Sequence, residues 1–398
     1  MTTFIPNAAS EVADAIQWAL AAEAPLEIVG GGSRRGVGRP QQAEHTLDLS
    51  KLSGVTLYEP EELVLSARAG TPLSEIEALL AGRGQELAFE PMDCAPLLLG
   101  VEPGHGTIGG VLASNLSGPR RIKAGAARDH ILGIHAVTGR GEAFKSGGRV
   151  VKNVTGYDLS KAMAGSWGTL AVVTDVTFKV LPAAPTETTL VLPGLLDDAA
   201  VAAMTLAMGS PAEVSSAAHL PEGIASKASQ MLNGAATILR VEGFGPSVDY
   251  RVAHLRDLFG GHGFEEITGD ASKALWRALR DCLPFADGTE RPVWRISMAP
   301  TEGHRLALEL RRSVPAELFY DWAGGLLWVR MYDDPEADLL RSLVRRFGGG
   351  HATLLRANAA HRAAVPVFEP QPPALAALSR RLKEQFDPKG ILNPGRMG

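Results

Sequence analysis

The stretch Glu27-Ile28-Val29-Gly30-Gly31-Gly32-Ser33 decides the fold, because a short apolar run leads directly into three consecutive glycines. Two further glycine-rich segments follow, at 103–110 (PGHGTIGG) and 165–170 (GSWGTL). Glycine allows main-chain N–H groups to approach an anion closely and to adopt positive φ without strain. Three such segments in the first half of the chain therefore predict a backbone shaped around a long ligand that carries phosphate groups.

The composition is that of a globular protein, and it excludes several classes. The chain has 398 residues, enough for two or three domains, and 45% of them are hydrophobic. A net charge of −5 argues against binding of nucleic acid through a basic face. The two cysteines, Cys94 and Cys282, form no CxxC, so this chain alone cannot hold an iron–sulfur cluster or a cysteine zinc site. We expect no metal site.

The sequence shows no segment suited to membrane insertion. The N-terminus has no basic region followed by an apolar one. The longest weakly polar stretch, 199–208, is far too short to span a bilayer. We therefore expect a cytoplasmic protein that reaches a membrane only through partner proteins.

Hydrophobic periodicity predicts an α+β fold in two main parts. A helix is expected with Ser10 as its N-cap, because Val12, Ile16 and Leu20 repeat at helical spacing, and a strand is expected at 26–29. The segment 182–185 (PAAP) is a Pro/Ala-rich joint, beyond which strands and helices alternate. The expected strands there are 188–192, 236–241, 293–298 and 326–331, and the expected helices are 196–208, 247–259, 301–313 and 335–347. This pattern predicts a small sheet with helices on one face, domains at 1–182 and 183–372, and a last helix and irregular tail at 373–398.

The segment Gly104-His-Gly106-Thr-Ile-Gly109 matches the GxGxxG fingerprint of a dinucleotide-binding Rossmann fold, with Asp129 about 20 residues later. Its context argues against that fold. The fingerprint should follow a first strand and open a long helix, whereas Pro103 precedes it and Gly118-Pro119 stops any helix soon after. We keep an NAD-dependent Rossmann enzyme only as a distant alternative.

Five motifs occur in a fixed order along the chain. They are 27–33 (EIVGGGS), 106–115 (GTIGGVLASN), 125–133 (GAARDHILG), the pair 152–159 (KNVTGYDL) and 165–174 (GSWGTLAVVT), and 387–396 (DPKGILNPGR). Together they resemble the motifs of the vanillyl-alcohol-oxidase, or PCMH-type, family of FAD-binding flavoproteins. The resemblance implies a PCMH-type FAD-binding domain at 1–182, an α/β cap domain at 183–372 that meets substrate or partner, and a tail that returns to the FAD domain.

The resemblance also implies which residues contact FAD. The two glycine loops would hold the pyrophosphate, the backbone of 172–173 would lie against the adenine, and Tyr157 and the tail would lie near the flavin ring. For Tyr157, a buried structural role is an equal alternative. The implied set is Gly30, Gly31, Gly32, Ser33, Gly36, Pro103, Gly106, Thr107, Ile108, Gly109, Gly110, Ser114, Tyr157, Val172, Val173, Asn393 and Arg396. Some members of the superfamily attach FAD through a histidine, but this chain is similar to the non-covalent branch, so His105 is not expected to be such a link.

Two segments, 117–121 (SGPRR) and 151–158 (VKNVTGYD), are most similar to the FAD-binding subunits of bacterial glycolate oxidases. This resemblance implies an FAD-dependent oxidoreductase that acts on the CH–OH group of 2-hydroxy acids as part of a complex. The complex would oxidise glycolate to glyoxylate. Its implied partners are a homologous catalytic flavoprotein subunit and an iron–sulfur subunit that receives the electrons.

One departure from the family leaves the catalytic residues unknown. Catalytic 2-hydroxy-acid members carry an HxxGDGNxH motif, and the corresponding region here, 356–362 (RANAAHR), offers nothing similar. Arg295 and Arg330, on predicted strands, either face a ligand or lie on a solvent face. Two alternatives therefore stay open: a self-sufficient FAD-dependent 2-hydroxy-acid dehydrogenase of the D-lactate type, and a non-catalytic assembly subunit with a residual FAD site.

Overall fold

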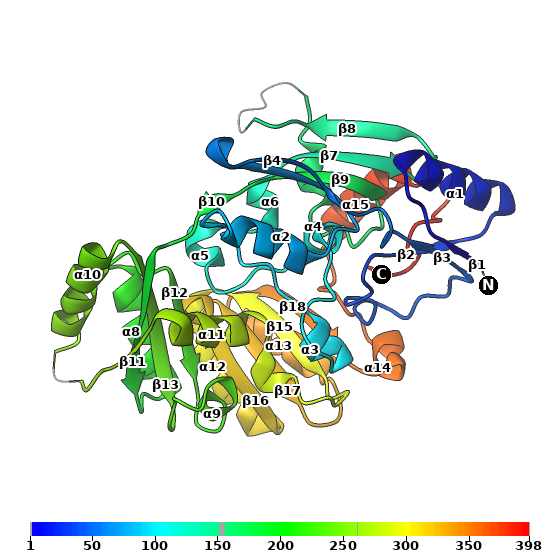
Figure 1. Ribbon diagram of the computed structural model, residues 1–398. Coiled ribbons are helices and arrows are strands. Elements are labelled where there is room, and N and C mark those ends of the chain that lie inside the picture. The colour runs from blue at the N-terminus through cyan, green and yellow to red at the C-terminus, as the bar shows by residue number, and fades with distance from the viewer. Residues whose placement is uncertain (1, 151–155, 261, 398) are drawn as a thin grey trace.

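The structure, a computed structural model, describes residues 2–150, 156–260 and 262–397 and contains two layered parts that meet along one face (Figure 1). The first part is built on an antiparallel sheet of five strands in the order β4-β5-β9-β7-β8. Its central strand β9 buries Val172, Val176 and Phe178, while the intervening residues 173, 175 and 177 are only partly buried, which is typical of a strand with one face on the core. The bounds are β4 Val55–Glu59, β5 Val64–Arg68, β7 Ile131–Thr138, β8 Ala143–Gly147 and β9 Ala171–Lys179.

A smaller parallel sheet, β1-β3-β2, places the first glycine-rich loop at the end of β2. Its bounds are β1 Thr2–Phe4, β2 Leu26–Val29 and β3 His45–Asp48, and helix α1, Ala9–Ala22, packs on it through Val12 and Ile16. The prediction of Ser10 as N-cap is wrong, since the N-cap is Ala8 and no side chain caps the helix. The nearest polar contact is the carboxylate of Glu11, which accepts the N–H of Asn7 at 2.8 Å.

Short helices fill the rest of the first part, and none has the place of a Rossmann crossover helix. The GxGxxG stretch follows irregular chain rather than a strand, and the helix that it opens, α4, ends after seven residues at Asn115 in left-handed conformation. The bounds are α2 Leu73–Ala81, α3 Ala95–Leu99, α4 Ile108–Ser114, α5 Arg121–Ala124, α6 Ala127–His130 and α7 Leu159–Met163, with a two-stranded ladder of β6 Gln85–Glu86 and β10 Leu181–Pro182.

The second part is an eight-stranded sheet in the order β14-β11-β13-β12-β16-β17-β15-β18, antiparallel throughout. It is larger than the small sheet predicted. The predicted strands correspond to β11 Thr186–Pro193, β13 Ala236–Gly243, β15 Val293–Met298 and β17 Leu326–Met331, and the others are β12 Ser216–Leu220, β14 Glu265–Thr268, β16 Ala316–Asp321 and β18 Gly350–Arg356. Strand β12 gave no alternating pattern because all five of its residues (SAAHL) are buried.

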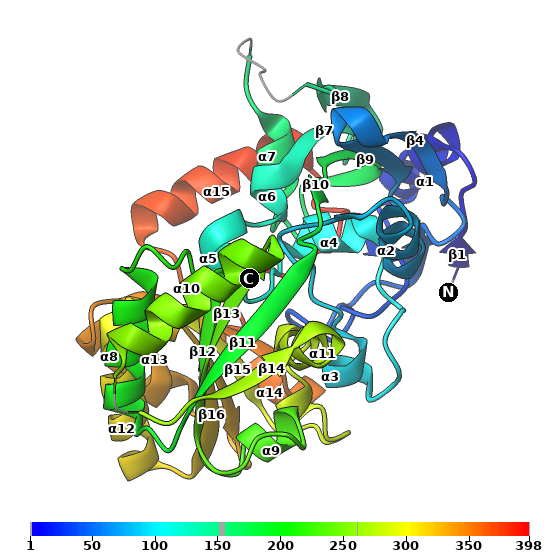
Figure 2. The ribbon, with the colours of Figure 1, turned by 60° about the vertical axis from the view of Figure 1, so that its left-hand side comes forward.

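Helices cover both faces of this sheet, so the prediction of helices on one face only is wrong. Figure 2 shows α10 and α11 on opposite sides of β11. Helix α11, Gly269–Arg280, buries Leu275, Trp276 and Leu279 against the second face, together with α9, Ala225–Ala228. The first face carries α8 Asp197–Met208, α10 Gly245–Leu258, α12 Gly303–Ser313 and α13 Ala337–Arg346.

The second face of the large sheet also meets the first part of the chain. One apolar core joins Met92, Leu116 and Trp167 of the first part to Phe319 and Trp328 of the sheet. The chain then passes through α14, Ala359–Ala364, and α15, Pro373–Phe386. The tail returns to the first part, where Leu392 forms a parallel bridge with Leu26. We propose 182/183 as the domain boundary, since β10 ends at Pro182 and β11 begins at Thr186.

Candidate functional site

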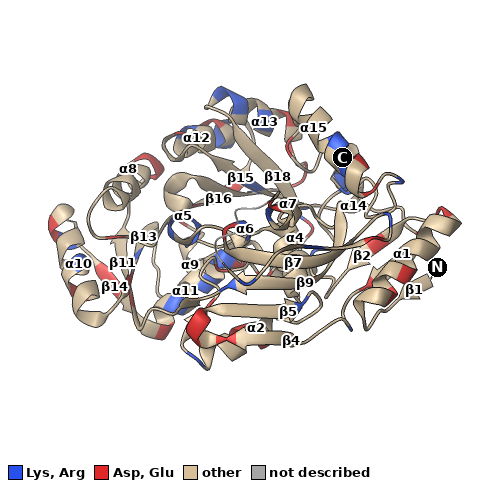
Figure 3. Ribbon diagram, turned by 90° about the horizontal axis from the view of Figure 1, so that it is seen from above, with Lys and Arg blue, Asp and Glu red and all other residues tan. Residues whose placement is uncertain are grey.

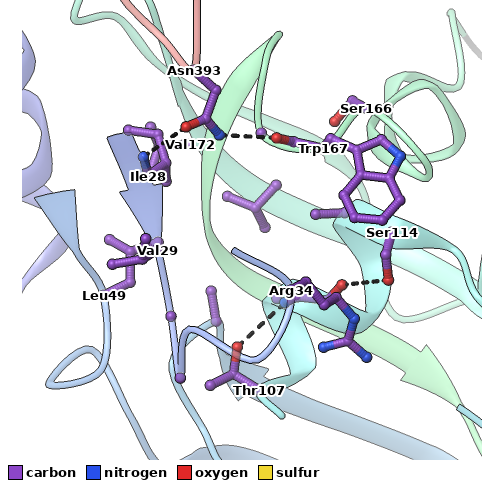
Figure 4. A pocket seen from close by; sticks show the side chains of 18 of the residues that line it. Ile28, Val29, Arg34, Leu49, Thr107, Ser114, Ser166, Trp167, Val172 and Asn393 are labelled. Atoms are coloured by element: carbon purple, nitrogen blue, oxygen red, sulfur yellow. Dashed lines mark hydrogen bonds between the residues drawn. The ribbon is translucent and has the colours of Figure 1, made fainter. Parts of the chain in front are cut away.

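A cavity lies in the first part of the chain where β2, the N-terminus of α4, the start of β9 and the C-terminal tail meet (Figure 4). The space inside it that is open to the centre of a water molecule is about 100 Å³. Twelve predicted contacts line it: Gly30, Gly31, Gly32, Ser33, Thr107, Gly109, Gly110, Ser114, Val172, Val173, Asn393 and Arg396.

The first glycine loop supplies hydrogen-bond donors to this cavity. In the described part of the chain, the main-chain N–H groups of Gly31, Gly32 and Ser33 have no protein acceptor. Gly32 has φ +75°, the left-handed conformation that turns successive N–H groups to one side. Gly31 passes so close to the second loop that a Cβ there would lie 2.0 Å from the carbonyl oxygen of His105. The loop is thus a preformed anion site held against its neighbour.

The second glycine loop positions the first and contributes fewer free donors. The N–H of Ile108 donates to the carbonyl of Thr71 at 3.0 Å, and that of Gly109 donates to Ala69 at 2.9 Å. The Thr107 hydroxyl accepts the N–H of Gly110 at 3.3 Å, and the Ser114 hydroxyl donates to the Gly110 carbonyl at 2.8 Å. These bonds fix the start of α4 against the segment that follows β5, and they leave the first loop as the main source of N–H donors.

Two buried arginines make the cavity positive. Arg34 is 8% exposed and donates to the carbonyl of Met92 at 2.7 Å, while its Nε has no partner among the described residues. Arg396 is 5% exposed, donates to the carbonyl of Arg34 at 2.7 Å, lies over the Trp167 ring, and also has an unpartnered Nε. Burial lowers the pKa of Arg396 to about 10, so it stays charged at neutral pH. These unsatisfied donors fit a diphosphate.

Sequence reasoning missed Arg34. Its only signal was its position directly after Ser33 in the first loop, whereas its burial beside Met92 depends on chain 58 residues away. The neighbouring Arg35 differs, because it pairs with Glu27 through Nε–Oε1 at 2.7 Å and is half exposed. The net charge facing the cavity therefore comes from Arg34 and Arg396.

Asn393 fixes the tail over the cavity. Its Oδ1 accepts the N–H of Ile28 at 2.9 Å, and its Nδ2 donates to the carbonyl of Trp167 at 2.9 Å, as Figure 4 shows. Its own N–H donates to Leu26 at 3.0 Å, and its φ of 44° is a conformation that asparagine tolerates well. One amide thus joins the tail to β2 and to the third glycine-rich segment.

We expect Asn393→Ala to lower the free energy of unfolding by about 2 kcal/mol, because two buried backbone groups lose their partners. It should also weaken FAD binding, since the tail is released from the cavity. Urea unfolding and flavin titration measure the two effects. As a control, Asn358→Ala removes the N-cap bond to His361 on the peripheral helix α14 and should leave FAD affinity unchanged. Equal loss of FAD in both variants would contradict this role of Asn393.

Val172 and Val173 both line the cavity, but their side chains pack into different hydrophobic cores. The Val172 side chain is 1% exposed and packs in the core of the small sheet, while Val173 packs on the core beneath the five-stranded sheet. Their side chains are therefore committed to packing, and the contact of their backbone with the adenine stays a prediction.

The structure places five predicted contacts outside the cavity lining: Gly36, Pro103, Gly106, Ile108 and Tyr157. Ile108 is fully buried in the core, because the first turn of α4 points it away from the loop. The carbonyl of Gly106 accepts the N–H of Leu73, and Pro103 lies on the surface. Tyr157 is 91% exposed, so neither of its two predicted roles fits the described structure. The adjoining motif residues 152–155 lie outside the described residues.

The fold and the cavity define an FAD-binding flavoprotein of the PCMH type. The family described as "FAD binding domain" matches residues 2–147, and "FAD linked oxidases, C-terminal domain" matches residues 368–397. Among solved structures, p-cresol methylhydroxylase has the same fold, with a TM-score of 0.73 at 15% identity over 100% of this chain and 88% of that chain. These matches exclude the Rossmann alternative and assign FAD as the cofactor.

Relatives that match nearly the whole chain identify its family within the FAD-binding flavoproteins. The chain is 35% identical over 390 residues, 96% of its length and 95% of the other, to glycolate oxidase subunit GlcE of Escherichia coli (strain K12). It is 26% identical over 98% of its length and 90% of the other to a D-lactate dehydrogenase of Archaeoglobus fulgidus. A shorter match, 40% over 21% of this chain and 18% of the other, is to glycolate oxidase subunit GlcD of Bacillus subtilis. The chain belongs to the GlcE family of FAD-linked oxidases and is an FAD-dependent oxidoreductase.

Proposed function

We propose that this chain is the FAD-binding subunit of a complex that oxidises glycolate to glyoxylate. The observation that carries the proposal is similarity to a glycolate oxidase subunit over nearly the whole chain, combined with a cavity whose free donors suit a diphosphate. The substrate class of the relatives, which include a D-lactate dehydrogenase, supports a small 2-hydroxy acid.

Bound FAD supplies a flavin ring that accepts a hydride from the carbon bearing the hydroxyl group. The residues of this chain would hold and shield it. The N–H groups of Gly31, Gly32 and Ser33, with Arg34 and Arg396, would bind the diphosphate, and the backbone of β9 would meet the adenine. We propose that FAD is bound non-covalently, because these contacts supply charge and donors without a covalent link to His105.

We expect Arg34→Gln to weaken FAD binding about tenfold, equivalent to about 1.4 kcal/mol, because one charged donor to the diphosphate is lost. Fluorescence titration of the apoprotein with FAD measures the affinity. The control is Arg305→Gln, which removes an arginine that is 61% exposed on α12. An Arg34→Gln variant with unchanged FAD affinity would show that Arg34 serves another ligand.

The proposed partners are a homologous catalytic flavoprotein subunit and an iron–sulfur subunit. Two distant cysteines in this chain require any cluster of the complex to be bound elsewhere. Across the described residues, no helix has both the length and the apolar character that a membrane crossing needs. We propose a cytoplasmic protein, with any membrane association made through its partners.

A self-sufficient 2-hydroxy-acid dehydrogenase is the second candidate, favoured by the similarity to D-lactate dehydrogenase along the whole chain. The visible spectrum of the isolated chain, recorded anaerobically before and after glycolate, separates the candidates. A flavin spectrum that bleaches only when the partner subunits are present supports the proposed complex. Bleaching of the isolated chain supports the second candidate, and absence of flavin supports a third, a non-catalytic assembly subunit.

A further inference from the structure

Trp322 connects the large sheet to the first part of the chain. It begins the 3-10 turn Trp322–Gly324 between β16 and β17, and it is 7% exposed. Its indole N–H donates to the carbonyl of Gly118 at 3.0 Å. Gly118 follows shortly after α4, whose residues Ala113 and Ser114 line the cavity. The ring therefore lies at the junction of the two parts of the chain, against the segment that follows α4.

Two arginines stack on this one ring. The guanidinium carbon of Arg295, on β15, lies 4.7 Å from the ring centroid, and that of Arg121, the first residue of α5, lies 5.0 Å from it. Figure 3 shows α5 between the large sheet and the first part of the chain. Both residues are partly exposed, so solvent reaches them. In residues 2–150, 156–260 and 262–397, neither guanidinium has a hydrogen-bond acceptor or an ion-pair partner.

The other stacked arginines of the large sheet have carboxylate partners. Arg330 lies over Phe285 and pairs with both Asp287 and Glu317. Arg240 lies over Trp276 and pairs with Glu90. The sheet thus neutralises these cations but leaves Arg295 and its neighbour Arg121 without a counter-ion.

Nearby carboxyl groups do not neutralise the arginine pair. Asp321 uses Oδ1 to accept the N–H of Trp322 at 2.7 Å, and burial raises its pKa to about 7, so it is only partly charged at neutral pH. Asp129 accepts the N–H of Ala126 at 2.8 Å and forms no ion pair with Arg121. Burial, followed by the proximity of Arg121, lowers the pKa of Arg295 to about 10. The two guanidinium groups therefore repel one another in the absence of an anion.

We propose that Arg121 and Arg295, on the Trp322 ring, form the site that binds the carboxylate of a small 2-hydroxy acid. This inference rests on the proposed function and assigns residues to its substrate. A carboxylate suits planar guanidinium donors, and a bound anion offsets both the desolvation of the two cations and their repulsion. The site lies between the two parts of the chain, where both arginines are only partly exposed, which favours a small molecule over a side chain of a partner protein.

Calorimetric titration of the FAD-loaded chain with sodium glycolate, at constant ionic strength, tests the site. Arg295→Met and Arg121→Met should each weaken glycolate binding at least about tenfold. The matched control is Arg291→Met, because Arg291 also stacks on an aromatic ring, Tyr332 at 5.0 Å, but has no second arginine on it. The control should bind glycolate as the wild type does.

Thermal unfolding gives a second readout that a merely structural role would not reproduce. Glycolate should raise the melting temperature of the wild type and of Arg291→Met but not that of Arg295→Met. Without glycolate, Arg295→Met should melt no lower than the wild type, because the substitution removes a repulsive pair. A large drop in melting temperature would instead identify Arg295 as structural and overturn the proposal.

Three further outcomes would distinguish a failure of this site from a failure of the proposed function. If the FAD-loaded chain binds no glycolate while the complex oxidises it, the function stands and this site is wrong. If glycolate binds at the arginine pair but the complex shows no turnover, the site stands and the proposed function fails. If the variants lose assembly with the partner subunits while glycolate binding is unchanged, the pair serves a partner carboxylate and the proposal is overturned.

Discussion

Replacing Gly31 with alanine is expected to abolish stable FAD binding, with the flavin content of the purified protein falling below about a tenth of the wild type. A Cβ at this position would lie 2.0 Å from the carbonyl oxygen of His105. Both groups belong to the backbone, so no side-chain rotation relieves the overlap, and the two glycine-rich loops must separate. Separation moves the free N–H groups of Gly32 and Ser33 away from the diphosphate.

The absorbance ratio at 450 and 280 nm and a titration of the apoprotein with FAD measure this loss. Gly245→Ala is the matched control, because a Cβ at Gly245 meets no atom within 4 Å and the residue begins helix α10. Circular dichroism should show both variants folded, since the loop contributes little to the cores. Retention of FAD at wild-type affinity in Gly31→Ala would mean that the cofactor binds elsewhere.

Replacing Arg240 with methionine is expected to lower the free energy of unfolding by about 3–5 kcal/mol, because it leaves a buried charge without its partner. Arg240 is 1% exposed and binds both carboxylate oxygens of Glu90, at 2.7 and 2.9 Å. Glu90 belongs to the first part of the chain and Arg240 to β13 of the large sheet. The pair therefore fastens the two parts together, with Arg120 and Glu242 in the same network.

The same pair predicts how stability depends on pH. Burial alone would raise the pKa of Glu90, but Arg240 and Arg120 outweigh it, and the pKa is lowered to about 2. The unfolded value is about 4.3. Because the folded pKa is the lower one, the stabilisation is fully present above about pH 4.3 and is lost as the pH falls toward 2. This part of the acid dependence should disappear in Arg240→Met.

Urea unfolding between pH 7 and pH 2.5 measures both effects. The double variant Arg240→Met with Glu90→Gln should recover much of the lost stability, because it removes the uncompensated carboxylate. If the single and double variants are equally unstable, the loss comes from packing against Trp276 rather than from charge.

Local sequence patterns predicted the cofactor class well and the cap sheet less well. Residues 30–33 of the first loop line the cavity, and they could be singled out because four consecutive residues carry the glycine pattern. The eight-stranded sheet was underestimated because β12 and β16 are buried on both faces and show no alternation. Ser10 was misassigned because its neighbour Glu11 and the backbone at Ala8 set the start of α1.

The sequence by itself determined the fold class, the order of the glycine-rich loops and the prediction of a ligand that carries phosphate groups, since each follows from motifs of a few consecutive residues. Only the tertiary structure decided which donors are free, because the N–H groups of Ile108 and Gly109 are consumed by residues 69–71. It also decided that Arg330 is neutralised, while Arg121 and Arg295 have no ion-pair partner among the residues that the structure describes. The balance of charge at a buried point depends on every chain segment that reaches it, and such segments lie far apart in sequence.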